Sequence, residues 1–160
     1  MSAMPSDFDR IVETCILMEI QAMNLYTTLA GRSEDPEAQR ILRFLAESEE
    51  GHVGRLVEIF SEFGRSAEKA LSMVDVVKAF QSEAWTQYKA RLAGAGLTET
   101  SPADDYLTFA IVAEAHARSH YARLADEADD PRLKGIFGTL ASEEAGHEEN
   151  LKRIRGALRG

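Results

Sequence analysis

The stretch LAESEEGHVGRL at residues 45–56 returns as LASEEAGHEENL at residues 140–151. Sliding the chain by 95 residues aligns 19–56 with 114–151 without a gap, and 14 of the 38 aligned pairs are identical. A repeat of this length indicates two copies of one supersecondary unit. The structure of that unit therefore decides the fold.

The apolar residues of both copies recur three and four positions apart, which is typical of amphipathic helices. A helix start is indicated where Asp or Ser precedes Pro, because these residues cap a helix and Pro is tolerated at its first position. The dipeptides of this kind are Asp35-Pro36, Ser101-Pro102 and Asp130-Pro131. Together these signals predict four long helices, at residues 7–31, 36–63, 102–128 and 131–158.

Residues 65–100 connect the two copies and contain a fifth predicted helix near 72–93, which the sequence GAGLTETSP then ends. A bundle helix of about 28 residues is roughly 42 Å long at about 1.5 Å per residue. A connection that contains a helix can run that length. We therefore predict a single all-α domain over 1–160, a four-helix bundle built from the duplicated hairpins 7–63 and 102–158 with a crossover helix between them.

Composition excludes several classes of partner and location. The net charge of −9 argues against nucleic acid or an anionic membrane as a partner, because both attract basic surfaces. No apolar run approaches the length of a transmembrane helix, and the first ten residues, MSAMPSDFDR, lack the basic-then-apolar order of a secretory signal. A single cysteine suits a reducing compartment. We expect a cytoplasmic protein.

Each copy of the repeat places a glutamate and a histidine on the apolar side of a helix. Glutamates precede the histidine at several offsets, but only the offset of three is occupied in both copies. This offset selects Glu49 with His52 and Glu144 with His147, and it sets aside Glu143. Side chains three apart on a helix can point at one interior spot.

Two further glutamates, Glu19 and Glu114, also lie on the apolar stripe, 30 residues before Glu49 and Glu144. Four buried carboxylates would repel one another, and each uncompensated buried charge costs several kcal/mol. Two divalent cations would balance the four negative charges. One Glu from each of two helices, with Glu-x-x-His from each of the other two, is the ligand set of a dimetal carboxylate site.

These motifs resemble those of the ferritin-like di-iron carboxylate superfamily, and most closely its rubrerythrin-like branch. The segments that carry the resemblance are MEIQAMNLY, LAESEEGHVGRL, AEAHARSHY and LASEEAGHEENL, which cover both hairpins. The resemblance implies that Glu49 and Glu144 bridge two metals. The other ligands that it implies are Glu19 and His52 for one metal, and Glu114 and His147 for the other.

Ligation that is rich in oxygen and poor in imidazole suits two iron ions, with manganese as the other possibility. The resemblance implies a di-iron oxidoreductase that reacts Fe(II) with peroxide or dioxygen and so detoxifies peroxide. It further implies an external electron-donor protein and a homodimer or larger homo-oligomer.

The chain departs from the rubrerythrin pattern in two places. Rubrerythrins carry a further Glu three residues after the third-helix ligand, where this chain has Ala117. They also usually end in a rubredoxin domain with four cysteines, and this sequence has one cysteine and no rubredoxin domain. Two alternatives therefore stand beside the peroxidase: a ferroxidase for iron storage or handling, and a non-enzymatic metal-binding bundle or cargo of an encapsulin lumen.

Five other residues near the predicted site attract attention. Tyr26 and Tyr121 follow the first and third glutamates by seven residues, and we expect them to hydrogen-bond ligand carboxylates. His116 and His120 belong either to a solvated face or to a surface metal or entry site. Cys15 is either a small buried apolar residue or a redox group.

Overall fold

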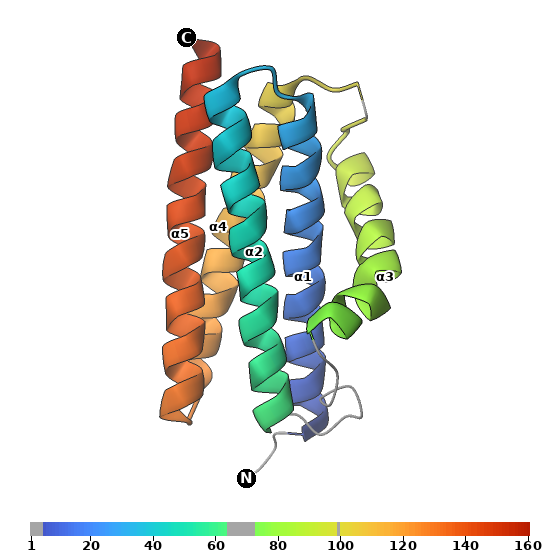
Figure 1. Cartoon of the computed structure of the whole chain (residues 1–160). Helices are drawn as coiled ribbons and strands as arrows, with labels where there is room; N and C mark the ends of the chain where they lie inside the picture. Colours follow the sequence, from blue (N-terminus) through green and yellow to red (C-terminus); the bar gives the residue numbers. More distant parts are fainter. Residues whose placement is uncertain (1–4, 64–72, 99) are drawn as a thin grey trace.

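The computed structural model of the chain describes residues 5–63, 73–98 and 100–160, and within them it contains five helices and no strand. The helices are α1 (Pro5–Arg32), α2 (Pro36–Phe63), α3 (Met73–Gly94), α4 (Ala103–Glu127) and α5 (Pro131–Arg159). The bundle consists of α1, α2, α4 and α5 running side by side, while α3 lies outside it against α1 (Figure 1). The predicted all-α, ferritin-like bundle is confirmed.

The bundle consists of two helical hairpins, α1–α2 and α4–α5, and the most extensive packing lies within each hairpin. The second helix of each hairpin begins at an aspartate cap. Asp35 Oδ2 accepts a hydrogen bond from the backbone N–H of Ala38 at 3.1 Å, and Asp130 Oδ1 accepts one from that of Arg132 at 2.8 Å. The Asp-Pro signals therefore start both helices as predicted.

The crossover helix α3 runs back along α1, so that α4 begins at the same end of the bundle as α2 (Figure 1). Residues 65–72 of the predicted connection lie outside the described residues. At its other end α3 stops in a Schellman motif, where Gly96 has a φ of 77° and the N–H of Leu97 donates to the carbonyl of Leu92 at 2.9 Å.

The predicted cap of α4 by Ser101 is wrong. Pro102 occupies the capping position in an extended conformation, with φ −61° and ψ 151°, and no side chain caps the helix. The hydroxyl of Ser101 instead accepts a hydrogen bond from the backbone N–H of Thr98 at 2.9 Å. The serine is thus engaged in the preceding loop, and α4 begins one residue later than predicted.

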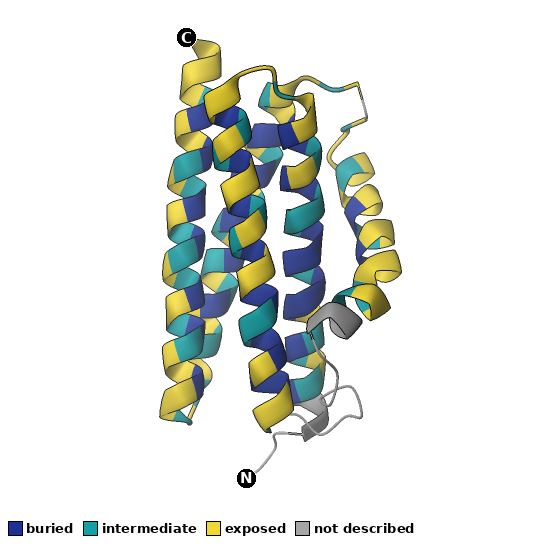
Figure 2. Ribbon diagram, in the orientation of Figure 1, coloured by how far each residue is buried: buried dark blue, intermediate teal, exposed yellow. Residues whose placement is uncertain are grey.

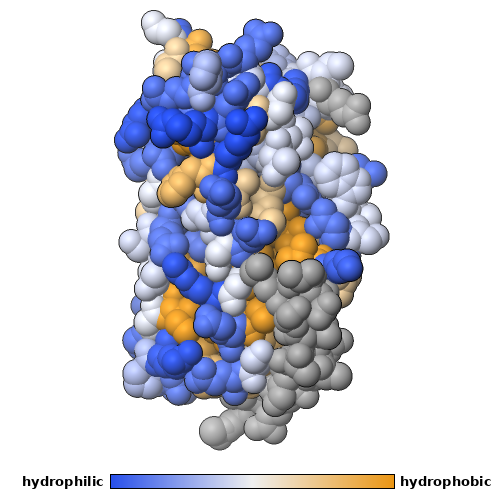
Figure 3. Space-filling model, viewed as in Figure 1, coloured by the Kyte–Doolittle hydropathy of each residue, from blue (hydrophilic) through white to orange (hydrophobic). Residues whose placement is uncertain are grey.

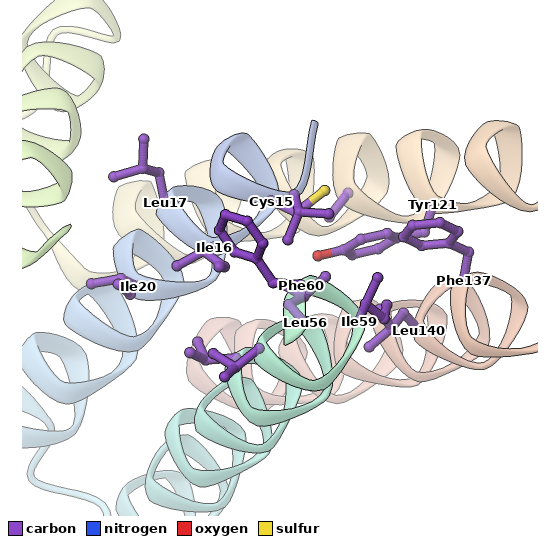
Figure 4. Close-up of a cluster of buried hydrophobic side chains, with 14 of the residues drawn as sticks. Cys15, Ile16, Leu17, Ile20, Leu56, Ile59, Phe60, Tyr121, Phe137 and Leu140 are labelled. Atoms are coloured by element: carbon purple, nitrogen blue, oxygen red, sulfur yellow. The ribbon is translucent and has the colours of Figure 1, made fainter. Parts of the chain in front are cut away.

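Two clusters of buried apolar side chains fill the bundle, and Figure 2 shows the buried residues on the inward sides of the helices. We call them the Phe60 cluster and the Leu42 cluster. The Phe60 cluster includes Ile16, Leu56, Phe60, Tyr121, Phe137 and Leu140, which point toward one another in Figure 4. The Leu42 cluster includes Leu25, Leu42, Leu45, Leu107, Leu151 and Ile154.

A layer of buried polar residues separates the two clusters. In α2, Leu45 belongs to the Leu42 cluster and Val53 to the Phe60 cluster, and Glu49 lies between them. The glutamates of α4 and α5 also lie between the two clusters, whereas Glu19 of α1 lies at the edge of the Phe60 cluster, just before Ile20. Burying one large aliphatic side chain contributes about 1.5–3 kcal/mol. The two clusters therefore supply the stability that allows a polar layer inside the bundle.

The outer surface contrasts with this interior. The face in Figure 3 is mostly hydrophilic, with apolar side chains confined to small separate areas. Across the part of the chain that the structure describes, no helix combines the length and the apolar character needed to cross a membrane.

Candidate metal centre

The six predicted ligands meet in the polar layer. They are Glu19 on α1, Glu49 and His52 on α2, Glu114 on α4, and Glu144 and His147 on α5. None of the six is more than 4% exposed. The repeat therefore brings together four carboxylates and two imidazoles that are far apart in the sequence.

The site has two halves, each built around one histidine. His52 Nδ1 lies 3.2 Å from Glu19 Oε2 and 3.0 Å from Glu49 Oε1. In the other half, His147 Nδ1 lies 2.8 Å from an oxygen of the α4 glutamate and 3.0 Å from an oxygen of Glu144. Each histidine thus turns Nδ1 toward the carboxylates and Nε2 away from them.

Two carboxylates are shared between the halves. Glu49 Oε1 is also 3.3 Å from His147 Nδ1, and Glu144 Oε1 is also 3.6 Å from His52 Nδ1. The two imidazole rings are stacked, with centroids 5.5 Å apart and planes at 12°. Glu49 and Glu144 therefore occupy the central position from which a carboxylate can bridge two cations.

The residues present fit a pair of divalent cations. Donor atoms of Glu49, His52, Glu144 and His147 all lie within 4.8 Å of one another. The four carboxylate oxygens of Glu49 and Glu144 are buried. Among the described residues, their Oε1 atoms face only the imidazole Nδ1 atoms, and their Oε2 atoms have no hydrogen-bond partner. A buried unpaired carboxylate oxygen is costly, and a metal ion would compensate it.

Burial makes most of these carboxylates hard to ionise when no metal is bound. Burial, and next the charge of Glu49, raises the pKa of Glu19 from 4.5 to about 7 and that of Glu114 to about 8. Burial first, then Glu19 and Glu49, also raises the pKa of Glu144. Glu49 is the exception, because its contacts with the two histidines outweigh burial and lower its pKa. Metal must therefore displace protons in order to bind.

Two buried tyrosines form hydrogen bonds with Glu19 and Glu114, which we call the outer carboxylates, and each bond links one hairpin to the other. Tyr121 on α4 donates its hydroxyl to Glu19 Oε2 at 2.6 Å, and Tyr26 on α1 is hydrogen-bonded to Glu114. Burial raises the pKa of both tyrosines well above 10, so both phenols remain protonated donors. Both tyrosines thus hydrogen-bond ligand carboxylates, as expected.

Three residues around the histidines were missed by the sequence reasoning. His52 Nε2 lies 2.8 Å from Glu143 Oε1, and His147 Nε2 lies 2.9 Å from Ser48 Oγ. Arg55 Nη1 donates to Glu143 Oε2 at 2.9 Å. Comparison of the two copies retained only identical positions, whereas Ser48 and Glu143 occupy the same position with different residues. Ser48 and Glu143 each stand four residues before a histidine, and this shared position is the sequence signal that could have identified them.

Cys15, His116 and His120 lie beside this centre but are not among its predicted ligands. Cys15 is fully buried, with Sγ 3.7 Å from His120 Nε2, and burial raises the pKa of its thiol to about 12. Its protonated thiol supports the interpretation as a small buried residue. His120 Nδ1 lies 3.1 Å from Arg123 Nη2, and His116 is exposed. Among the described residues, neither histidine joins a cluster that could hold a metal.

A cavity of about 320 Å³ reaches the site from the side formed by α1, α3 and α4. The buried part of its lining includes the carboxylate-bearing residues Glu19, Glu49, Glu114 and Glu144. Ala117, which stands where rubrerythrins carry a further glutamate, lines it as well. The exposed part of the lining includes Arg91, His116 and Arg123. The cavity thus leads from a basic outer surface to the carboxylates.

The comparisons with known proteins agree with this arrangement. The family model described as rubrerythrin matches residues 10–100 and 105–160, which covers nearly the whole chain. No curated protein and no solved structure matches the chain significantly.

Proposed function

The chain belongs to the rubrerythrin family, and on that premise we propose that it is a di-iron oxidoreductase that reacts with peroxide or dioxygen. We propose further that it detoxifies peroxide with electrons from an external donor protein, as a homodimer or larger homo-oligomer. The alternative metal pair is manganese, since the same oxygen-rich ligands suit both ions.

The pair of central carboxylates is the observation that carries this proposal. Glu49 and Glu144 each bring Oε1 within 3.6 Å of both imidazole Nδ1 atoms, and the Oε2 atoms of both have no hydrogen-bond partner among the described residues. A merely structural polar layer would satisfy these oxygens with hydrogen bonds. Two cations would satisfy them and balance the charge.

The residues of the chain would have distinct parts in this function. Glu49 and Glu144 would contact both ions, and the remaining ligands would divide as Glu19 with His52 and Glu114 with His147. When bound, a pair of ferrous ions supplies the two electrons that cleavage of an O–O bond requires. Tyr121 and Tyr26 would fix the orientation of the outer carboxylates through their hydrogen bonds. The two apolar clusters enclose the site from both ends of the bundle, and their low dielectric strengthens the electrostatic interactions inside.

A ferroxidase of iron handling is the second candidate. The six residues form a nearly symmetric set, and Ala117 stands where rubrerythrins carry their further glutamate. A symmetric six-residue site favours simple oxidation of Fe(II) over a reaction that needs an exchangeable seventh ligand.

Turnover with peroxide tests the proposal against this candidate. Protein loaded anaerobically with Fe(II) is mixed with H₂O₂ or dioxygen in the presence of a chemical reductant, and oxidant consumption is followed. Repeated consumption of H₂O₂ without gain of iron supports the peroxidase. A single stoichiometric oxidation followed by retention of many irons per chain supports the ferroxidase. Metal binding without any oxidation contradicts both.

Filling the cavity at Ala117 should slow the reaction with peroxide without removing the metal. Ala117→Leu adds three carbon atoms beside the carboxylates, so we expect the rate with H₂O₂ to fall about tenfold or more, which corresponds to about 1.4 kcal/mol. Stopped-flow measurement on Fe(II)-loaded protein gives this rate, and metal content is measured in parallel.

Ala122→Leu is the matched control for this change. Ala122 lies on the same helix and is exposed, outside the lining of the cavity. It should react like the parent protein. If Ala117→Leu binds metal and reacts as fast as Ala122→Leu, the cavity is not the route to the site.

A further inference from the structure

The Nε2 atoms of the two histidines contact different residue types at positions that the 95-residue repeat relates. His52 Nε2 contacts Glu143 on α5 at 2.8 Å, and His147 Nε2 contacts Ser48 on α2 at 2.9 Å. Residues 48 and 143 are related by the 95-residue repeat, and each contacts the histidine of the other copy. The site is thus symmetric in the six predicted ligands and asymmetric in the groups that hold its imidazoles.

The carboxylate on the His52 side is itself fixed in place. Arg55, three residues after His52, donates to Glu143 Oε2 at 2.9 Å, while the other oxygen of Glu143 faces the imidazole. Asn150 occupies the position that corresponds to Arg55 in the second copy. Arg55 and Glu143 therefore form a charged pair next to His52. The corresponding group next to His147 is the neutral hydroxyl of Ser48.

The two partners restrict the imidazoles to different degrees. A histidine that binds metal through Nδ1 must carry its proton on Nε2. An ionised carboxylate only accepts hydrogen bonds, so Glu143 admits only the Nε2–H form of His52. A hydroxyl both donates and accepts, so Ser48 admits either form of His147. A carboxylate that holds the far N–H of a metal-binding histidine also increases its strength as a ligand.

From this contrast we propose that Glu143 and Ser48 are positioning residues that make the two metal positions unequal. The ion beside Glu19 and His52 binds first and more tightly, and the ion beside Glu114 and His147 is the more weakly held and exchangeable one. The inference rests on the proposed dimetal function and adds an order of filling to it.

Stepwise metal binding tests the inference without any measurement of activity. Metal-free protein is titrated anaerobically with Mn(II), and free Mn(II) is followed by electron paramagnetic resonance. The parent protein should bind two ions per chain in two steps. Glu143→Ser should weaken the first step about 10- to 100-fold, the usual effect of removing a partner of a metal-bound histidine. The two steps should then become similar.

The exchange of both residues gives the sharpest variant. Ser48→Glu combined with Glu143→Ser should restore two unequal steps, now with the tighter ion beside His147. Sequential loading with one equivalent of ⁵⁷Fe(II) and then one of ⁵⁶Fe(II) reports this, because Mössbauer spectroscopy detects only the first ion. Its spectrum should differ between the parent protein and the exchanged variant. If the exchanged variant does not fold, Arg55→Gln should weaken the first step alone.

The chain offers a matched control one residue earlier in each helix. Glu47 and Ser142 are also related by the repeat and are both exposed. Glu47→Ser combined with Ser142→Glu makes the same exchange of residue types and should leave both binding steps unchanged. Two equal steps in the parent protein, or no effect of Glu143→Ser, would overturn the inference while the dimetal site stands. Absence of any metal binding would overturn the proposed function and the inference together.

Discussion

Replacing both central carboxylates, as Glu49→Gln with Glu144→Gln, is expected to abolish binding of the metal pair and the stabilisation that comes with it. Metal at about 1,000 times its dissociation constant stabilises the folded state by about 4 kcal/mol per ion. For a chain of this size each kcal/mol raises the melting temperature by roughly 2–4 °C. Two ions should therefore raise the melting temperature of the parent protein by on the order of 15–30 °C.

The double variant should show almost none of this rise, because glutamine keeps the shape of glutamate but is a poor metal ligand. Thermal unfolding followed by circular dichroism, with and without Fe(II) or Mn(II), measures the difference. Glu50→Gln with Glu149→Gln is the control, since it removes two exposed carboxylates from the same two helices. It should respond to metal like the parent protein. Equal responses of all three proteins would show that the central carboxylates hold no metal.

The second large effect is a reversal of the pH dependence of stability when metal binds. In metal-free protein, burial raises the pKa of Glu19 to about 7 and of Glu114 to about 8, from 4.5. The pKa values of His52 and His147 are also raised above 6.5, because their contacts with the glutamates outweigh burial. The folded protein then binds more protons than the unfolded chain between pH 5 and 8. Its stability must fall as the pH rises across that window.

The metal-bound protein should behave in the opposite way. Its ligands are deprotonated in the folded state, whereas the unfolded carboxylates and imidazoles take up protons below their ordinary pKa values. Stability therefore rises with pH up to about the ordinary pKa of histidine, near 6.5. The lowered pKa of Glu49 acts below pH 5 and does not disturb this window.

Melting temperatures at pH 5, 6, 7 and 8, with chelator or with Mn(II), provide the measurement. The two curves should diverge as the pH rises, and the gap between them should be largest at pH 8. The Glu49→Gln, Glu144→Gln variant should give the same curve under both conditions. Parallel curves in the parent protein would mean that metal does not displace protons from the buried carboxylates.

Much of the fold followed from the repeat, because a duplicated hairpin constrains both halves at once. The Asp35 and Asp130 caps set the helix starts, and apolar spacing set the inward faces. The same reasoning gave a wrong helix cap at Ser101. A Ser-Pro dipeptide does not specify whether the hydroxyl bonds forward to the helix or backward to the loop, and here it accepts from Thr98.

The convergence of the six buried residues could also be predicted, because identity between the copies singled out polar positions on apolar faces. Glu143, Ser48 and Arg55 could not be found in this way. Their contacts join one hairpin to the other, and helical periodicity within one helix does not determine the rotation of the facing helix. The proximity of Cys15 to His120 depends in the same manner on how α1 faces α4.

The count of iron ions per chain tests the dimetal centre most directly. Protein reconstituted anaerobically with Fe(II) and freed of excess metal is measured by native mass spectrometry and elemental analysis. We predict two iron ions per chain in the parent protein and none in the Glu49→Gln, Glu144→Gln variant. One ion per chain, no ion, or the same content in both proteins would contradict a metal pair held by the central carboxylates.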